Sequence, residues 1–545
     1  MSYTAHVDTF ARDHLPPEEQ WPEMIFELPE LKYPERLNCV VELLDRNVVN
    51  GNGDRIAIIG TDCTPWTYVQ LLDKVNQITH VLRDDMGLVP GNRVLLRGPN
   101  SPMFAACWLA VVKAGMVAVG TMPLLRAKEL TDIVSKAEVG AALCDARLIA
   151  ELRGAQAACP MLTKVVLFHD ESPDSLESRM RGKSTDCIAA PTSAEDTCLF
   201  AFTSGTTGKP KGTMHFHRDI MAACDCFPRS ILKATADDRF IGSPPLAFTF
   251  GLGGLLLFPL RIGASTVLLE KTSPDRLLGA VGAHRASVLV TAPTTYRVIG
   301  SHLRSGGASS DLSNLRKCVA AGEALPAPTR KLWKDATGIE IIDGIGATEM
   351  FHIFISHTEE EARPGATGKP IPGYRARVVD EAGKPLPPGN VGRLAVKGPT
   401  GCRYLADDRQ RNYVQDGWNL TGDAYLVDDD GYFVYQARTD DMIISAGYNI
   451  AGPEVESALL AHPAVAECGV IGLPDDKRGQ IVAAFVVLKS GNQGDAAMTQ
   501  QLQDFVKQTI APYKYPRAVR FVPALPRTET GKLQRFKLKE LEAGA

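Results

Sequence analysis

The chain has 545 residues, of which 22% are charged, and its formal net charge at pH 7 is −4. This length exceeds what one hydrophobic core usually supports, so we expect two or more domains. The small net charge, without a long basic run, argues against a nucleic-acid or anionic-membrane surface and favours small-molecule partners. The 12 cysteines lack the spacing of zinc or redox motifs, which predicts buried thiols in a reducing cytoplasm. The sequence shows neither a signal peptide nor an apolar stretch of about 20 residues, so we expect a cytoplasmic protein without membrane insertion.

Short apolar runs alternate with helix-like stretches through residue 300. This alternation is typical of α/β layers with largely parallel sheets. The predicted strands include 93–97, 141–144, 164–168, 198–202 and 287–291.

The residue composition and the predicted strand lengths change after residue 368. Glycine and proline become frequent, and the predicted strands at 375–379 and 392–396 are short and separated by turns. The C-terminal part returns to a compact mix, with predicted helices at 453–461 and 498–510 and strands at 467–471 and 482–488. We therefore predict an α/β fold with a large N-terminal domain of layered α/β subdomains over 1–438, a β-rich subdomain at about 368–438 within it, and a small mobile C-terminal α+β domain over 439–545.

The run at 203–211, TSGTTGKPK, combines glycines, hydroxyl side chains and two lysines. Glycines let the backbone turn tightly and bring its N–H groups close to an anion, while the hydroxyls and lysines add donors and charge. The spacing differs from a Walker A loop, because two residues separate the glycines and Pro210 follows Lys209. The run predicts a polyphosphate-binding loop after a buried strand, with an ordinary solvated loop as the alternative.

A second turn, Asp343-Gly344, follows the apolar pair at 341–342 and leads to Thr348-Glu349. A hydroxyl and a carboxylate at such a strand end could bind phosphate and Mg²⁺. A plain turn followed by a helix, with Glu349 favouring the helix dipole, explains the same residues equally well.

Two further residues, Asp423 and Lys532, indicate a function only when they are considered together with the other motifs. Asp423, after Gly422, could accept a hydrogen bond from a ribose hydroxyl, although a solvated turn is as consistent with the pattern. Lys532 follows a glycine near the C-terminus, where a lysine is usually solvated. Between them, polar residues at 436–441 precede an apolar strand and predict an interdomain hinge.

Together and in this order, these segments resemble the adenylate-forming superfamily of acyl-CoA synthetases, peptide-synthetase adenylation domains and luciferases. The resemblance covers nearly the whole chain and implies ATP, Mg²⁺ and coenzyme A, with Glu349 as the metal ligand and Asp440 at the hinge. The implied catalytic residues are Lys532, Thr348, Glu349 and Asp440. The implied ATP and AMP ligands are Thr203, Ser204, Gly205, Thr206, Thr207, Gly208, Lys209, Gly322, Glu323, Ala324, Asp343, Gly344, Thr348, Asp423 and Arg438. The implied coenzyme A loop is Ser445, Ala446, Gly447 and Tyr448.

The implied reaction has two halves. A carboxylate attacks the α-phosphate of ATP to give acyl-AMP and pyrophosphate, and a thiol then attacks the activated carbonyl after the C-terminal domain rotates. Because 13 residues follow Lys532, we expect free coenzyme A as the acceptor in place of a fused carrier domain. The sequence leaves the assembly open, with a homodimer as one option.

The segments that form the acid pocket in this family supply aromatic and small residues here. The predicted pocket residues are Phe248, Phe250, Gly251, Tyr296, Ala320, Ala321 and His352. Aromatic walls with a small-residue base suit a flat ring, although each phenylalanine alone is as consistent with ordinary core. The run at 346–355 resembles benzoate-type CoA ligases, and the segments 3–12 and 33–38 resemble 2-aminobenzoate–CoA ligases. We therefore expect an enzyme of aromatic-acid degradation acting on 2-aminobenzoate, with benzoate or a medium-chain fatty acid as alternatives.

Some residues depart from the family pattern, and other functions share its motifs. Asp343 stands where the family often has tyrosine, and Ala347 where it often has an aromatic residue. The glycines at 251–254 lack the spacing of a dinucleotide fingerprint and are interpreted as helix-packing residues. A luciferase-like oxygenase would share every adenylation motif, whereas a non-catalytic binding paralogue would be expected to lose Lys532 or Glu349. Both residues are present, which favours catalysis.

Overall fold

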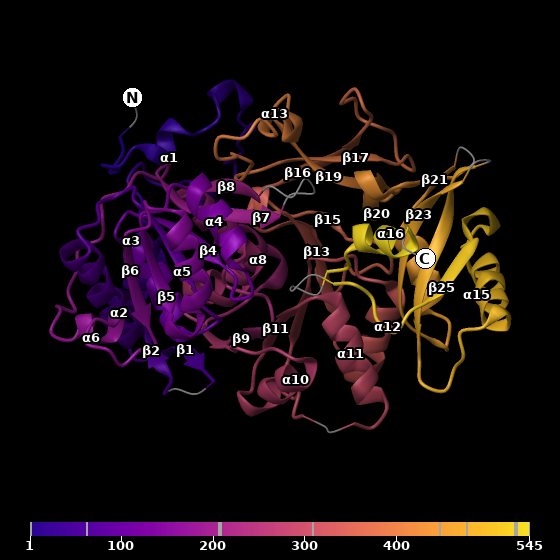
Figure 1. Ribbon diagram of the computed structural model, residues 1–545, viewed down its shortest axis with the longest axis horizontal. Coiled ribbons are helices and arrows are strands. Elements are labelled where there is room, and N and C mark those ends of the chain that lie inside the picture. Colours follow the sequence, from indigo (N-terminus) through magenta and orange to yellow (C-terminus); the bar gives the residue numbers. More distant parts are fainter. Residues whose placement is uncertain are drawn as a thin grey trace.

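The computed structural model describes residues 3–61, 64–204, 210–307, 310–445, 448–475, 478–527 and 532–543. Within these residues the strands form four sheets. Figure 1 shows the N-terminal sheets at the left, the β-rich part at the top and the C-terminal sheet at the right.

The first sheet is largely parallel, and β8 alone in it runs antiparallel to its neighbour among the described strands. All residues of the neighbouring strands β3 and β5 are buried, as expected for parallel strands that helices cover on both faces. Its order is β6 (Lys164–Phe168), β5 (Ala141–Asp145), β3 (Arg93–Arg97), β4 (Val117–Thr121), β7 (Thr197–Ser204) and β8 (Pro210–Phe216).

The second sheet has nine strands, with six parallel strands in its middle and antiparallel strands at its edges. Its order is β15 (Lys369–Pro370), β14 (Ile353–Ser356), β13 (Ile341–Gly346), β12 (Lys317–Ala320), β11 (Val288–Thr291), β9 (Arg239–Gly242), β10 (Ser265–Leu268), β1 (Ile56–Gly60) and β2 (Trp66–Thr67). The carboxyl ends of its parallel strands share one edge, which is where ligands bind in such sheets.

Helix α3 (Pro102–Lys113) lies inside the protein, and all of its residues are buried. Its sequence is apolar around the whole circumference, as expected for a helix covered on every side. The Ser101 hydroxyl caps its N-terminus by accepting a hydrogen bond from the Phe104 N–H. The buried Lys113 ammonium donates to Asp45 (2.6 Å) and Asn76 (2.7 Å). Because α3 contacts strands of both sheets, it forms part of their shared core.

The remaining helices of this part cover the faces of the two sheets (Figure 1). They are α1 (Phe10–Asp13), α2 (Tyr68–His80), α4 (Ala127–Lys136), α5 (Ile149–Ala158), α6 (Leu176–Met180), α7 (His217–Phe227), α8 (Thr249–Leu252), α9 (Phe258–Ile262), α10 (Pro274–Ala283), α11 (Pro293–Arg304) and α12 (Ala327–Thr337). The alternation of strands and helices that we predict through residue 300 is thereby confirmed.

The third sheet is antiparallel and matches the predicted β-rich subdomain. It contains β16 (Arg375–Val379), β17 (Gly392–Lys397), β19 (Trp418–Val427), β18 (Val414–Gln415) and β20 (Phe433–Arg438), with α13 (Gln410–Tyr413) beside it. β20 ends at Arg438, and a short 3-10 helix, η10 (Thr439–Asp441), follows. We therefore keep the junction of residues 438 and 439 as the proposed domain boundary.

The fourth sheet forms an α+β unit with its own core of aliphatic residues. Its strands are β21 (Ile443–Ser445), β22 (Tyr448–Ile450), β23 (Val465–Asp475), β24 (Gly479–Leu488) and β25 (Ala518–Phe521), and its helices are α14 (Gly452–Leu460), α15 (Ala496–Thr509) and α16 (Arg535–Ala543). The predicted fold class is confirmed. None of the described helices is long and apolar enough to cross a membrane.

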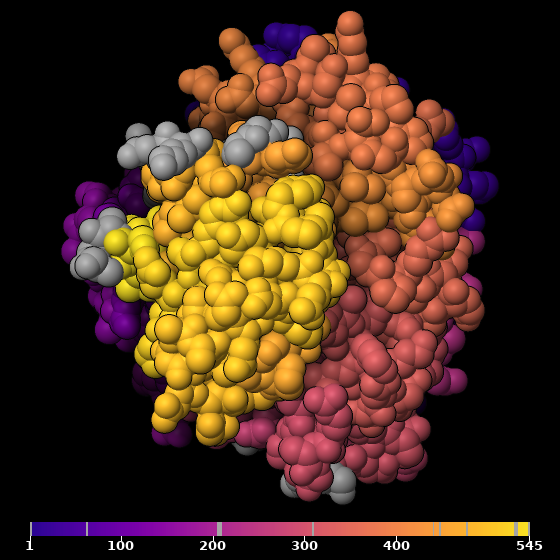
Figure 2. All heavy atoms as spheres, turned by 90° about the vertical axis from the view of Figure 1, so that its right-hand side faces the viewer, coloured from indigo at the N-terminus to yellow at the C-terminus, as the bar shows by residue number. Residues whose placement is uncertain are grey.

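Ion pairs join this C-terminal unit to α11 and to the loop after β12. Arg297 of α11 donates to the Ala466 carbonyl oxygen and pairs with Glu467 (3.4 Å). Arg527 pairs with Glu467 (2.7 Å) and with Glu323 (3.7 Å). Figure 2 shows the C-terminal residues, in yellow, seated directly against pink and orange residues from the middle of the chain.

Candidate functional site

Two neighbouring parallel strands bring the predicted adenine-binding residues together. β12 and β13 pair with Ala320 beside Asp343, so Gly322 and Gly344 follow at the same edge of the sheet. Gly322 has a φ of +89°, which a glycine adopts without strain. Burial raises the pKa of Asp343 to about 7, although the Arg330 charge opposes this shift. Near neutral pH this carboxyl can therefore donate or accept a hydrogen bond.

Thr348 and Glu349 lie at the tip of a β-hairpin between β13 and β14. Both belong to a short 3-10 helix, η9 (Thr348–Met350). Phe351 follows with φ +69° and ψ −54°, and the His352 N–H donates to the Met350 carbonyl oxygen at 2.9 Å. This is a γ-turn in a conformation that a non-glycine residue adopts at a cost of about 1–3 kcal/mol. The turn fixes Glu349 relative to the pocket residue His352.

His215 supports this tip from β8. Its Nε2–H donates to the Thr348 carbonyl oxygen (2.8 Å), and its ring meets the Phe351 ring edge-on, with ring centres 5.2 Å apart. Burial lowers the pKa of His215 to about 4, so the ring is neutral at neutral pH. The role of His215 could not be predicted from the sequence, because 133 positions separate it from Thr348 and no local motif links them.

Tyr404 is a second residue that the sequence analysis misses. Its hydroxyl donates to Glu349 Oε1 (2.5 Å), and Lys211 Nζ lies 3.4 Å from the same hydroxyl. Burial and the Glu349 charge both raise the pKa of Tyr404, which keeps its hydroxyl protonated. The hydrogen bond therefore fixes the carboxylate that we predict to bind Mg²⁺.

The predicted phosphate loop begins and ends beside this carboxylate. Thr203 pairs with Lys211 and Ser204 with Pro210 in the β7–β8 ladder, and Lys211 contacts Tyr404. Five predicted phosphate ligands and the Ser204 side chain lie outside the described residues; the five are Gly205, Thr206, Thr207, Gly208 and Lys209.

Asp423 and Arg438, the predicted ribose ligands, face each other across β19 and β20. Arg438 Nη1 lies 3.0 Å from Asp423 Oδ1 and 3.1 Å from the Thr421 carbonyl oxygen. Burial raises the pKa of Asp423, and the nearby Arg438 opposes that shift. The pairing thus holds a carboxylate in position at a buried site.

Lys532 is the C-terminal residue that reaches the predicted nucleotide site. Its Cε lies 3.6 Å from the position that a Cβ on Gly322 would occupy. Lys532 is an exposed residue, yet desolvation by the surrounding protein lowers its pKa, and the carboxylates of Glu323, Asp423 and Glu349 oppose this effect. The structure therefore places Lys532 at the loop after β12, within electrostatic range of Asp423 on β19 and Glu349 on η9. Two further predicted nucleotide ligands follow Gly322 in the chain. Glu323 accepts a hydrogen bond from Thr294 Oγ1 (2.8 Å), and Ala324 is exposed.

The predicted hinge and the predicted coenzyme A loop both follow β20 in the chain. The backbone of Asp440 belongs to η10, and its side chain lies outside the described part of the chain. Ser445 pairs with Tyr448 across β21 and β22, and the two residues between them, Ala446 and Gly447, are not among those described. The Tyr448 ring is exposed and stacks on Tyr513, with ring centres 4.6 Å apart.

His352, a residue of the predicted acid pocket, lies among aromatic rings. Its ring centre is 4.5 Å from that of Phe258, 5.6 Å from that of Phe250 and 5.9 Å from that of Phe227. Gly253 leaves room for this ring, since a Cβ there would lie 2.6 Å from His352 Cδ2. His352 Nε2 lies 3.3 Å from the Phe250 carbonyl oxygen, whereas its buried Nδ1 has no hydrogen-bond partner among the described residues. Burial lowers the pKa of His352 to about 3, so the ring is neutral.

The other predicted pocket residues divide between two faces of the sheet. Phe248 and Gly251 flank Phe250 at the start of α8, where a Cβ on Gly251 would lie 2.1 Å from the Pro245 carbonyl oxygen. Ala321 belongs to the cluster that contains the Phe227 and Phe258 rings. The prediction places Tyr296 and Ala320 with them, and the structure corrects both.

Tyr296 and Ala320 belong to a separate core cluster under α11 and α12. The Tyr296 hydroxyl donates to the carbonyl oxygens of Leu289 (2.8 Å) and Val319 (3.1 Å), and its ring packs edge-on against Trp333. Successive side chains of a strand point to opposite faces, so Ala320 and Ala321 cannot both line one pocket. Tyr296 is a core residue.

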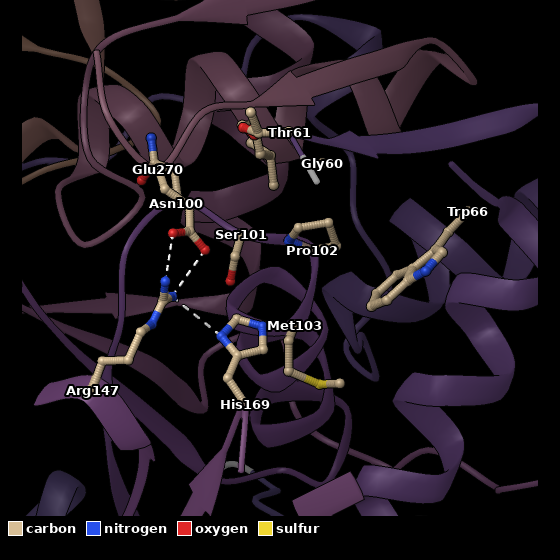
Figure 3. Close-up of a pocket in the computed structure, with 11 residues that line it drawn as sticks. Gly60, Thr61, Trp66, Asn100, Ser101, Pro102, Met103, Arg147, His169 and Glu270 are labelled. Carbon is tan, nitrogen blue, oxygen red and sulfur yellow. Dashed lines mark hydrogen bonds and ion pairs between the residues drawn. The ribbon is translucent and has the colours of Figure 1, made fainter. Parts of the chain in front are cut away.

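A cavity of about 460 Å³ lies at the ends of β1, β10 and β6, lined by Trp66, Met103 and His169 among others (Figure 3). Arg147 lies at its wall and donates to Glu270 (2.8 Å) and Asp145 (2.7 Å). Because two carboxylates already hold this guanidinium, the cavity is not built as a phosphate site. Its lining shares no residue with the predicted nucleotide or acid sites.

Known proteins resemble this chain over most of its length. The model of the AMP-binding enzyme family matches residues 45–404, and the model of the AMP-binding enzyme C-terminal domain matches residues 454–532.

The chain is 36% identical to a benzoate–CoA ligase of Thauera aromatica, over 94% of this chain and 97% of the relative. It is 31% identical to a 3-hydroxybenzoate–CoA ligase of Aromatoleum sp. (strain CIB), over 93% of this chain and 97% of the relative. Among solved structures, the anthranilate CoA ligase AuaEII in complex with anthranoyl-AMP superposes with a TM-score of 0.89 at 34% identity, covering 95% of this chain and 100% of that chain.

Proposed function

This chain belongs to the AMP-binding enzyme family, and we propose that it is an ATP-dependent ligase that joins 2-aminobenzoate to coenzyme A. At the coarser level it is an AMP-forming acid–thiol ligase for aromatic acids, like the relatives described above. The observation that carries the proposal is the position of Lys532 beside Gly322, within electrostatic range of the carboxylates of Glu323, Asp423 and Glu349.

In the first half-reaction, an oxygen of the acid attacks the α-phosphorus of ATP, and pyrophosphate leaves. The protein's part is to position the reactants and neutralise the developing charge. We assign Lys532 to the bridge between acid and α-phosphate, Asp423 and Arg438 to the ribose, and the segment 203–211 to the leaving phosphates. One well-aimed donor contributes about 3–4 kcal/mol to such a transition state.

The residues around Glu349 fit a magnesium ion. Mg²⁺ prefers oxygen ligands and is usually bound by one or two carboxylates together with substrate phosphates. The Glu349 carboxylate, held by Tyr404 and next to the Thr348 hydroxyl, supplies that donor set at the end of the phosphate loop. When bound, the ion would neutralise charge on the polyphosphate.

In the second half-reaction, the thiol of coenzyme A attacks the acyl carbonyl and AMP leaves. We propose that the C-terminal unit first turns about Asp440, which withdraws Lys532 and offers the loop from Ser445 to Tyr448 to the thiol. This proposal is supported by the position of Asp440 two residues after the end of β20, between the strands of the third and fourth sheets.

The choice of 2-aminobenzoate rests on the two ring nitrogens of His352. Because the ring is neutral and Nε2 lies against the Phe250 carbonyl oxygen, Nε2 carries the proton and Nδ1 is an acceptor. A buried acceptor without a partner costs about 1–3 kcal/mol. An ortho amino group would donate to it, and the aromatic rings of Phe227, Phe250 and Phe258 suit the substrate ring.

Benzoate is the alternative substrate, and a substrate panel separates the two. AMP formation that depends on coenzyme A would be measured with 2-aminobenzoate, benzoate, the hydroxybenzoates, cinnamate and medium-chain fatty acids. The highest kcat/KM should belong to 2-aminobenzoate. A benzoate optimum would overturn the role of His352 Nδ1, and a fatty-acid optimum would overturn the aromatic pocket.

Replacing His352 by leucine should remove the discrimination between the two acids. We expect kcat/KM for 2-aminobenzoate to fall about 10-fold, as for the loss of one buried hydrogen bond, with a much smaller change for benzoate. Phe250→Leu is the matched control, because it alters the wall without changing a polar group and should lower both values alike. An equal loss for both acids in His352→Leu would contradict the assignment.

Replacing Asp440 by proline should separate the half-reactions at the hinge. Proline fixes φ and would restrict the rotation, so we expect pyrophosphate release from ATP and acid to persist while acyl-CoA formation from supplied acyl-AMP falls at least about 10-fold. Asp441→Pro tests whether the effect is specific to the position. Normal rates for both half-reactions would contradict a hinge at Asp440.

A cytoplasmic location and a homodimeric assembly are further proposals. Cytoplasm supplies ATP and coenzyme A, and none of the cysteines in the described part of the chain forms a disulfide, which fits a reducing compartment. Light scattering after size-exclusion chromatography would give the assembly, and a monomeric mass would contradict the dimer.

A further inference from the structure

Three residues far apart in the sequence form a buried thiol–imidazole cluster. They are Cys39, Cys198 and His217, and each side chain is 0% exposed. The sulfur of each cysteine and one ring nitrogen of His217 all lie within 4.8 Å of one another. Cys39 Sγ is 3.2 Å from His217 Nδ1. None of these residues belongs to the site that we assign to ATP, acid or coenzyme A.

Each member of the cluster lies on a well-fixed part of the fold. Cys39 begins a helical segment and is held in place by its neighbour Asn38, whose side-chain amide donates to three backbone carbonyl oxygens. Cys198 lies in β7, between Thr197 and Leu199, which pair with β8. His217 is the first residue of α7. Ligands on such fixed elements are already gathered when an ion arrives.

The charges of the cluster select the ion. Both sulfur atoms are fully buried, and they lie within 4.8 Å of each other and of one ring nitrogen of His217. Two buried thiolates would repel each other without a cation, and a divalent cation would bring their total charge to zero. Thiolate and imidazole ligands favour zinc over magnesium or calcium.

We propose that Cys39, Cys198 and His217 bind one zinc ion through Cys39 Sγ, Cys198 Sγ and His217 Nδ1. Both thiols lose their protons on binding, and the Nδ1 lone pair turns from the Cys39 N–H, which it accepts at 3.2 Å, to the metal. Three protein ligands leave a fourth position for a water molecule. The ion would tie the N-terminal segment to β7, the strand that leads into the phosphate loop.

The first test is the metal content of the full-length protein. After expression with zinc in the medium and passage over a chelating resin, elemental analysis should find about one zinc ion per chain. The matched pair of variants is Cys198→Ser, which should lose this zinc, and Cys226→Ser, which changes another buried thiol on α7 and should keep it. Wild-type protein without zinc, or equal zinc in both variants, would overturn the proposal.

The second test needs no variant and so remains valid if Cys198→Ser fails to fold. Wild-type protein produced in cobalt-supplemented medium should show thiolate-to-cobalt charge-transfer absorption of the strength expected for two thiolates, together with tetrahedral d–d bands. Mass spectrometry of the same protein under non-reducing conditions should show Cys39 and Cys198 as free thiols after metal removal. An absence of charge-transfer absorption, or a Cys39–Cys198 disulfide, would overturn the proposal.

Discussion

Replacing Lys532 by alanine should lower the rate of acyl-AMP formation by about 100- to 1,000-fold. The side chain reaches Gly322, and the charges of Glu323, Asp423 and Glu349 act on its ammonium. In the proposed arrangement it meets the reacting acid and the α-phosphate together. Alanine removes that charge where negative charge develops in the transition state. The loss should appear in kcat more than in the KM for ATP, because the interaction is strongest in the transition state.

The measurement follows each half-reaction separately. Pyrophosphate release reports the first half, and acyl-CoA formation from supplied acyl-AMP and coenzyme A reports the second, which should stay near the wild-type rate. Lys537→Ala is the control, because Lys537 is an exposed lysine of α16 close in sequence to Lys532. Equal losses in both halves would contradict the role of Lys532 in adenylation and would point to general damage of the C-terminal unit.

Local sequence patterns predict the strands and the order of the motifs well. Apolar runs such as 93–97 and 164–168 become β3 and β6 with the predicted bounds. Burial on both faces of a parallel strand such as β3 leaves a continuous apolar pattern. The turns near the ends of β12 and β13 can also be predicted from the sequence, because their glycines mark positions where a side chain would be strained or would not fit. A glycine is needed at Gly346, because a Cβ there would lie 2.7 Å from the carbonyl carbon and oxygen of His352.

Contacts between residues that are far apart in the sequence leave no local sequence pattern. Tyr404 is 55 positions from the Glu349 carboxylate that it fixes, and Cys39 is 178 positions from His217. The error at Tyr296 has a related cause. Its segment is correctly placed after β11, but the face of the sheet that the ring meets depends on how α11 packs, and this is a tertiary property.

Replacing His215 by leucine should lower kcat of the first half-reaction about 10- to 100-fold, although His215 touches no substrate in our assignment. Its Nε2–H donates to the Thr348 carbonyl oxygen (2.8 Å), and its ring packs against Phe351. Phe351 is the residue in the strained γ-turn. Without the donor, the carbonyl of Thr348 loses its partner and the hairpin tip can relax, which moves the Thr348 hydroxyl and the Glu349 carboxylate together.

A positioning role for His215 predicts effects that simple destabilisation does not. The Mg²⁺ concentration for half-maximal pyrophosphate release should rise in His215→Leu, because Glu349 is displaced, while the KM for the aromatic acid stays nearly constant. His215→Gln restores an N–H donor at a similar reach and should recover most of the rate and the Mg²⁺ dependence. Since the pKa of His215 is lowered to about 4 by burial, a neutral amide is the appropriate replacement for its neutral ring. If His215→Gln and His215→Leu lose the same activity at the same Mg²⁺ requirement, the hydrogen bond to Thr348 does not position Glu349.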